Sequence, residues 1–199
     1  MLKRLDTPYI DLLLLHQPFG DVLGAWKDME KAVELGKVKS IGLSNFEEYH
    51  FEDIMENAKI KPVLMQVECH PYYQQVELKE KLDKYDIKLE CWYPLGGEGE
   101  GGNQKLFADE TIKKIGENHS KTPAQVILRY EIQCGLIVIP GAHNPDYIKE
   151  NINVFDFELS NEEMEAMKNL DKKQRFFISF EGTPYEQIET MLTGTVLPD

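Results

Sequence analysis

Residues 9–18 read Tyr-Ile-Asp-Leu-Leu-Leu-Leu-His-Gln-Pro, an apolar run that ends at a polar pair and a proline. Similar runs follow at residues 38–43, 63–68, 87–92 and 136–139, and each ends at polar, proline or glycine residues. Short apolar runs bounded in this way are typical of strands in a parallel sheet that is covered on its faces. The sequence therefore predicts five strands.

Segments in which apolar residues recur with helical spacing separate the predicted strands. They cover residues 22–35, 51–55, 76–85, 111–119, 123–132 and 161–170. Pro123 stands at the first helical position of one segment, and Ser160 with Glu163 forms a capping-box pattern at the start of another. Alternation of strands and helices indicates a parallel sheet and the α/β class.

The composition excludes several classes of partner. The chain has 199 residues, with 22 Lys and Arg against 35 Asp and Glu, and a net charge of −13. This balance disfavours nucleic acid and anionic membranes, because both attract clustered lysine and arginine. No apolar run approaches the roughly 20 residues of a membrane span. Three cysteines without a CxxC pair indicate reduced thiols, no metal site and a cytoplasmic location.

Polar or aromatic residues follow every predicted strand. The clusters are His16-Gln17, Ser44-Asn45, Gln66 with Glu68 and His70, Trp92-Tyr93, and His143-Asn144. Each has a structural interpretation, since Ser and Asn cap helices and proline ends strands. Ligand sites of parallel α/β proteins, however, lie just beyond the carboxyl ends of the strands. Five clusters at one edge of the sheet favour a functional site there.

The motifs at these strand ends have a specific pattern. They are residues 11–18 (DLLLLHQP), 36–46 (GKVKSIGLSNF), 66–71 (QVECHP), 94–96 (PLG) and 138–141 (VIPG). Together they resemble the aldo/keto reductase family over residues 1 to about 177. The resemblance implies a (β/α)₈ barrel that binds NADPH at the carboxyl ends of its strands and reduces aldehydes and ketones. A tyrosine delivers the proton, a lysine and an aspartate lower its pKa, and a histidine orients the carbonyl group.

The resemblance also implies roles for individual residues. The carbonyl-orienting histidine corresponds to His16, which is the catalytic residue expected here. Asparagine and glutamine each offer a donor and an acceptor, as a carboxamide ligand requires. The residues expected to hold the nicotinamide carboxamide are Ser44, Asn45 and Gln66. Trp92 stands where the family usually has a tyrosine stacked on the nicotinamide ring, Leu95 and Gly96 border the pyrophosphate, and Glu150 and Asn151 face the adenine.

The sequence departs from the family pattern in two respects. The family's catalytic Tyr, Lys and Asp lie on units that precede the strand ending at His16, so we expect the N-terminal third of the barrel, with its first three strands, to be absent. Gly141 and Tyr147 replace the lysine and arginine that hold the 2′-phosphate of NADPH. Loss of these charge-assisted hydrogen bonds predicts weak binding or acceptance of NADH.

The expected architecture is therefore an incomplete TIM-type (β/α) barrel over residues 1–170, with an aromatic-containing tail over residues 171–199. A glycine-rich loop is expected at residues 96–102. The favoured function is that of an NAD(P)H-dependent oxidoreductase acting on small carbonyl compounds. The alternative is a catalytically inactive truncated barrel that binds dinucleotide weakly or self-associates. Open sheet edges favour a homo-oligomer in either case.

Overall fold

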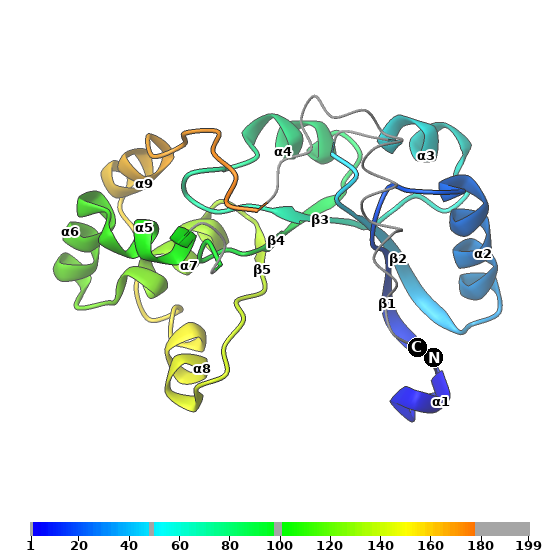
Figure 1. The fold of residues 1–199 in the computed structure, drawn as a ribbon, viewed down its shortest axis with the longest axis horizontal. Helices are drawn as coiled ribbons and strands as arrows, with labels where there is room; N and C mark the ends of the chain where they lie inside the picture. The colour runs from blue at the N-terminus through cyan, green and yellow to red at the C-terminus, as the bar shows by residue number, and fades with distance from the viewer. Residues whose placement is uncertain (1, 48–49, 98–100, 178–199) are drawn as a thin grey trace.

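A five-stranded parallel sheet forms the centre of the protein (Figure 1). The computed structural model describes residues 2–47, 50–97 and 101–177. The strands lie in sequence order and are β1 (Ile10–Leu15), β2 (Val38–Ser44), β3 (Leu64–Glu68), β4 (Lys88–Trp92) and β5 (Ile137–Val138). All four strand pairs are parallel. The five predicted strands and the α/β class with a partial (β/α) barrel are confirmed.

Helices connect the strands, as the alternating pattern requires. They are α1 (Leu2–Leu5), α2 (Val22–Glu34), α3 (Phe51–Asn57), α4 (Val76–Asp83), α5 (Gly102–Ala108), α6 (Glu110–His119), α7 (Pro123–Gln133), α8 (Pro145–Ile152) and α9 (Asn161–Lys168). The six predicted helices are confirmed, whereas α1, α5 and α8 were not expected. The predicted capping box of α9 is present, because the Ser160 side chain accepts from the Glu163 N–H and the Glu163 side chain accepts from the Ser160 N–H.

Two apolar clusters hold the helices against the sheet. The first packs α2, α3 and α4 on β2 and β3, and it buries Trp26, Ile41, Phe51, Met65 and Leu82 almost completely. The indole N–H of Trp26 donates to the Ile60 carbonyl at 3.1 Å, so this polar group is satisfied inside the cluster. Figure 1 shows α2 and α3 gathered at one end of the sheet and α5, α6, α7 and α9 at the other.

The second cluster joins α5, α6, α7 and α9. Its fully buried side chains are Leu106, Ile112, Val126, Ile127 and Met167. Most buried residues of α7 are apolar, and the polar or charged ones are Gln125, Arg129 and Glu131. The first cluster holds α2, α3 and α4 in place, and the second holds α5, α6, α7 and α9 together.

The sheet is open at both ends over the described residues. β1 pairs there with β2 alone and β5 with β4 alone. Residues 12–15 of β1 are half-buried, although Ile41 and Leu43 of β2 are fully buried. Leu13 and Leu15 pack against the first cluster but stay partly exposed, as expected for a strand at the edge of an incomplete barrel.

The first residues of the predicted tail fold back over the sheet. The backbone N–H groups of Lys172 and Gln174 donate to the Tyr72 carbonyl at 3.0 and 3.1 Å, and Phe176 is 2% exposed. The remainder of the predicted tail, residues 178–199, lies outside the described residues, as do residues 98–100 of the predicted glycine-rich loop. Within the described ranges, no helix is long and apolar enough to cross a membrane.

Candidate functional site

Asn45 links the carboxyl ends of three strands. Its side-chain amide donates to the His16 carbonyl and to the Ser44 hydroxyl oxygen, both at 3.1 Å, and its carbonyl oxygen accepts the indole N–H of Trp92 at 2.9 Å. His16 follows β1, Ser44 ends β2 and Trp92 ends β4. The structure therefore brings together the polar residues that the sequence places at these strand ends.

The backbone at Asn45 is in the left-handed region, with φ at 61°. Asparagine is enriched in this conformation among non-glycine residues. The Asn45 N–H continues the sheet pattern by donating to the Gln66 carbonyl at 3.0 Å. The left-handed turn directly after β2 thus aims the Asn45 side chain across the strand ends instead of along the sheet.

Gln66 and Ser44 supply further hydrogen-bonding groups at this edge. The side-chain nitrogen of Gln66 donates to the Glu90 carboxylate at 2.5 Å, and no described residue donates to the side-chain oxygen of Gln66, Oε1. The Ser44 hydroxyl oxygen accepts from Asn45, and the side chain is fully buried. An acceptor at Gln66 beside a hydroxyl at Ser44 is a donor and acceptor set that fits a primary carboxamide.

Aromatic side chains line the edge beside these groups. The Trp92 ring lies edge-to-face with Tyr93, with centroids 4.9 Å apart, and with Phe177 at 5.4 Å. Phe176, one residue earlier, stacks on His70 at 4.4 Å. Edge-to-face and stacked pairs add to the area that such rings bury. The beginning of the tail therefore lies against the strand-end cluster.

Glu68 attaches this part of the tail to β3. The side chain is completely buried, and its Oε1 accepts the backbone N–H groups of Phe176 at 2.6 Å and Phe177 at 3.0 Å. His70 Nε2 lies 3.2 Å from the same oxygen, and Arg175 lies 3.9 Å from Oε2. Burial by itself raises the pKa of Glu68, but the hydrogen bonds from His70 and the two backbone groups outweigh it and lower the pKa.

The other expected cofactor residues lie on separate segments. Leu95 is half-buried, and Gly96 has φ at 82° in close contact with the start of α5. Glu150 lies on α8, where its carboxylate accepts the Thr122 hydroxyl that caps α7, and Asn151 beside it is half-buried. Gly141 and Tyr147 are both exposed. Figure 1 shows α8 at the end of a long connection from β5, apart from the other helices.

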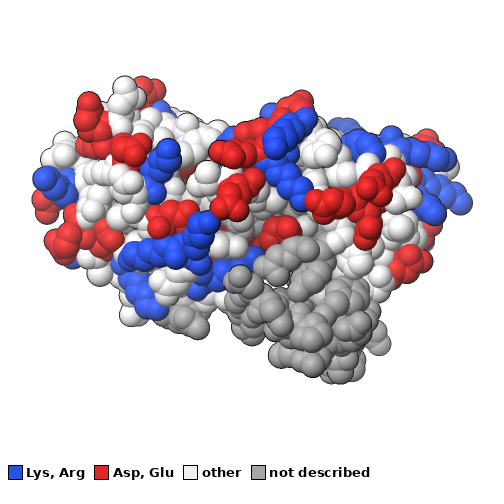
Figure 2. Space-filling view, turned by 90° about the horizontal axis from the view of Figure 1, so that it is seen from above, with Lys and Arg blue, Asp and Glu red and all other residues white. Residues whose placement is uncertain are grey.

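Charge over the molecule agrees with the composition. Figure 2 shows acidic and basic side chains interspersed over most of the face seen from above, with one group of basic side chains at its lower left. The described residues contain no group of three or more His, Cys, Asp or Glu side chains placed to hold a metal ion. The strand-end site is thus built from amides, hydroxyls and aromatic rings.

Five parallel strands with helices between them, and amide and aromatic side chains collected at the strand ends, define part of a (β/α) barrel. The chain belongs to the aldo/keto reductase family, whose model matches residues 1–172. The resemblance in the sequence is therefore confirmed.

Individual relatives are about 40% identical in sequence to this chain. The chain is 40% identical over 87% of its length to a 9,11-endoperoxide prostaglandin H2 reductase of Trypanosoma cruzi, and 41% identical over 87% to a glyoxal reductase of Bacillus subtilis. These matches cover 60% and 61% of the two relatives, so the chain spans about three fifths of their length.

Solved structures give the same result. An aldo-keto reductase from a deep-sea metagenome library matches with a TM-score of 0.87 and 37% identity, over 92% of this chain and 67% of that one. The D53A mutant of Gox0644 in complex with NADPH matches with a TM-score of 0.82 and 41% identity, over 92% of this chain and 66% of that one. The relatives thus include carbonyl reductases and a structure that holds NADPH.

Sequence reasoning missed two carboxylates. Glu90 on β4 pairs with Gln66, and Glu131 on α7 is buried with neither oxygen paired within the described residues. A signal for Glu131 exists in the sequence, because it stands four residues after Ile127 and three after Leu128, on the apolar side of the helix. A charged residue at such a position marks a buried polar group.

Proposed function

We propose that this chain forms the nicotinamide-binding part of an NAD(P)H-dependent oxidoreductase that acts on small carbonyl compounds. The observation that carries the proposal is the hydrogen-bonded set of Ser44, Asn45 and Trp92, with the Gln66 carbonyl oxygen beside it. The relatives named for glyoxal reduction and the NADPH complex of a neighbouring structure support the same class of reaction. Small aldehydes such as methylglyoxal are the substrates to test first.

The chain's own residues would act in the following way. When bound, the nicotinamide cofactor supplies the hydride for carbonyl reduction. Ser44 and Gln66 would hold its carboxamide, Asn45 would keep the strand ends in register, and the Trp92 ring would offer a face for the nicotinamide. His16, exposed at the end of β1, would orient a carbonyl oxygen. Leu95, Gly96, Glu150 and Asn151 would border the rest of the dinucleotide.

We expect the dinucleotide to bind with little preference for NADPH over NADH. Gly141 and Tyr147 offer no cation for the 2′-phosphate, so the ratio of the two dissociation constants should be below about 10, or roughly 1.4 kcal/mol. Fluorescence titration measures both constants, because a ligand near Trp92 changes its emission, and a Trp92→Phe variant identifies that signal. A preference of 100-fold, about 2.7 kcal/mol, would reveal another cation at the 2′-phosphate.

The same titration tests the strand-end site through Asn45. Asn45→Ala removes the three side-chain hydrogen bonds that join His16, Ser44 and Trp92, and it should weaken binding of either dinucleotide about 10-fold or more. Asn118→Ala, at an exposed position on α6, is the matched control and should leave both dissociation constants unchanged. Equal affinities for the Asn45 variant and the unmodified chain would place the cofactor elsewhere.

We expect no appreciable carbonyl reduction by the 199-residue chain alone. The resemblance implies that the family's proton-donating tyrosine, with its lysine and aspartate, matches none of these 199 residues, and general acid catalysis is worth about 10²–10⁴-fold. Oxidation of NADH and NADPH with a panel of small aldehydes, followed by absorbance, measures the rate. Turnover at ordinary enzyme rates that disappears in His16→Ala would contradict this expectation and imply a different acid.

A second candidate function is self-association of a chain that binds dinucleotide weakly or not at all. The observation that favours it is the sheet itself, in which β1 and β5 stand at the ends and residues 12–15 are only half-buried. Exposed strand edges and apolar patches favour pairing with a second copy.

Light scattering on the purified chain tests this second candidate. We expect a mass of at least twice 23.0 kDa at micromolar concentrations. The simplest assembly is a dimer with two-fold symmetry. A 23.0 kDa species at every concentration, without binding of a hydrophobic dye, would show that the chain covers its own apolar surface.

A further inference from the structure

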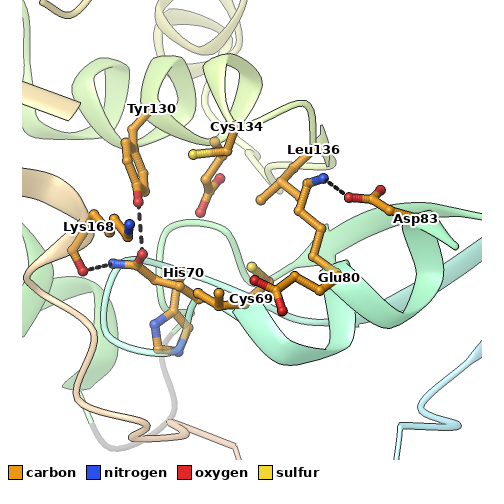
Figure 3. Close-up of a pocket in the computed structure, with 12 residues that line it drawn as sticks. Cys69, His70, Glu80, Asp83, Tyr130, Cys134, Leu136 and Lys168 are labelled. Atoms are coloured by element: carbon orange, nitrogen blue, oxygen red, sulfur yellow. Dashed lines mark hydrogen bonds and ion pairs between the residues drawn. The ribbon is translucent and has the colours of Figure 1, made fainter. Parts of the chain in front are cut away.

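A cavity of about 280 Å³ lies between α4 and α7, beside the residues that follow β3 and the residue that precedes β5 (Figure 3). An engineered apolar cavity of about 150 Å³ admits benzene, so this one has room for a ring with a short chain. Its lining residues include none of the proposed cofactor residues and not His16. They are Cys69, His70, Gln74, Val76, Lys79, Glu80, Asp83, Tyr130, Glu131, Cys134, Leu136 and Lys168.

Glu131 is the unusual member of this lining. It is 1% exposed, and neither of its carboxyl oxygens has a hydrogen-bond partner among the described residues. A buried polar group without a partner is costly, commonly by about 1–3 kcal/mol, and in native proteins such groups are few. Glu131 therefore presents two free acceptors in the wall of a cavity.

Several neighbouring polar groups are already paired, whereas the buried Nδ1 of His70 has no partner among the described residues. The Tyr130 hydroxyl donates to the Gln74 carbonyl oxygen at 2.8 Å, and the Gln74 amide donates to the Met167 carbonyl at 2.9 Å. The Lys79 ammonium is 2.6 Å from Asp83 on its own helix, and Figure 3 shows this pair at the side of the cavity. None of these paired groups donates to Glu131, so a ligand in the cavity can supply the donor.

Charged and titratable groups approach Glu131 from several elements. The thiols of Cys69, after β3, and Cys134, at the end of α7, lie beside its carboxyl group, and Lys79 of α4 and Lys168 of α9 are at the cavity. Burial raises the pKa of Glu131 well above its usual range, and the two thiols add to the rise. An empty cavity thus favours the neutral acid.

We propose that this cavity binds a small organic amine, whose ammonium group pairs with the Glu131 carboxylate and whose hydrocarbon part fills the space between α4 and α7. Val76 and Leu136 offer apolar surface for that part. An ammonium group brings several donors to the two free oxygens. Its positive charge favours the ionised carboxyl, so binding drives the Glu131 proton into solvent.

The electrostatic surroundings favour a cation over an anion of the same shape. Glu80 and Asp83 lie at the cavity with Glu131, as do Lys79, which pairs with Asp83, and Lys168. The net charge of −13 on the whole chain raises the concentration of cations around it, and an ionised Glu131 repels a carboxylate inside the cavity. A neutral alcohol would supply only a single donor, so it should bind more weakly than the amine.

Isothermal titration calorimetry with 2-phenylethylammonium as the probe tests the proposal on the full chain. The isosteres 2-phenylethanol and phenylacetate are the neutral and anionic comparisons. We expect the ammonium probe to bind at least 10-fold more tightly than either. In two buffers of different ionisation enthalpy, the observed heat should differ by an amount that corresponds to release of up to one proton.

Variants locate the binding. Glu131→Gln keeps the shape of the side chain and should weaken the ammonium probe 10-fold or more while abolishing proton release. Glu117→Gln, the same change at an exposed position on α6, is the matched control and should leave the affinity unchanged. Val76→Trp adds bulk at a residue that is 41% exposed and lines the cavity, so it should weaken all three probes.

Three results would overturn the proposal. They are the absence of binding at millimolar probe, equal affinity of the ammonium probe for the unmodified chain and Glu131→Gln, and equal affinity of the unmodified chain for the ammonium and phenylacetate probes. Circular dichroism checks that each variant is folded. Because Val76→Trp leaves Glu131 intact, it keeps the test decisive if Glu131→Gln fails to fold.

Discussion

Glu68→Ala is expected to lower the free energy of unfolding by about 3–5 kcal/mol, the usual cost of removing one partner from a buried charged pair. The carboxylate is completely buried and accepts the N–H groups of Phe176 and Phe177, and it faces His70 and Arg175. Alanine leaves the two backbone N–H groups and His70 without this acceptor, whereas Arg175 keeps its ion pair with Glu47 at 2.7 Å. Urea denaturation gives the stability change, and hydrogen exchange at Phe176 and Phe177 reports whether the tail detaches.

Glu77→Ala is the matched control for this experiment. Glu77 pairs with Lys173, in the same tail segment, at 2.7 Å, but its side chain is 86% exposed. Exposed ion pairs contribute about 0–1 kcal/mol. We expect Glu77→Ala to change stability little and to leave exchange at Phe176 unaltered. If both variants lowered the free energy of unfolding by similar amounts, the buried contacts of Glu68 would contribute no more to stability than the exposed ion pair of Glu77.

The stability of the unmodified chain relative to Glu131→Gln should fall as pH rises. Burial raises the pKa of Glu131 in the folded protein, so the native state keeps a proton that the unfolded chain releases above the ordinary glutamate pKa of about 4.3. Unfolding then releases a proton, and each pH unit above that value lowers the free energy of unfolding by up to about 1.4 kcal/mol. The loss continues until pH passes the raised native pKa, and below about pH 4 it is absent.

Urea denaturation of both proteins between pH 4 and pH 8 measures this difference. Glutamine does not titrate, so Glu131→Gln removes the pH dependence due to this residue, while other groups cancel between the two proteins. Glu117→Gln should shift stability by less than about 0.5 kcal/mol at every pH, as exposed substitutions do. A stability difference between Glu131→Gln and the unmodified chain that is constant with pH would mean that Glu131 is ionised in the folded state.

The strands could be predicted because each one ends abruptly. The four leucines at residues 12–15 stop at a polar pair and Pro18, and the run that ends at Ile139 stops at Pro140. In the structure, β1 ends at Leu15 and β5 ends at Val138, in each case before the proline. Proline supplies no backbone donor, so a strand boundary beside it follows from local chemistry alone.

Helix α8 escaped prediction because its apolar residues do not face a core. Asn144 caps it and Pro145 stands at its first position, which are starting signals visible in the sequence. However, none of its residues is buried, and Tyr147 and Ile148 are exposed. Periodicity measures packing against a core, so a helix without buried residues gives a weak signal.

The polar site was only partly predictable for a related reason. Ser44, Asn45, Gln66 and Trp92 follow directly from their positions at strand ends. The hydrogen bonds from the backbone N–H groups of Phe176 and Phe177 to Glu68 join residues more than 100 positions apart. No local sequence pattern predicts such a contact. Likewise, the burial of Glu131 depends on how α7 packs against the sheet and the adjoining helices.

Each strand of the sheet pairs with its immediate neighbours in the chain, in the order β1-β2-β3-β4-β5. Pairing between consecutive units keeps the sequence separation between contacting strands smaller than pairing between distant units would. A nascent chain emerging from the ribosome can therefore add one strand and its helices to the sheet at a time. The same order allows whole units to be gained or lost at either end over evolution while the pairing of the remaining strands is preserved.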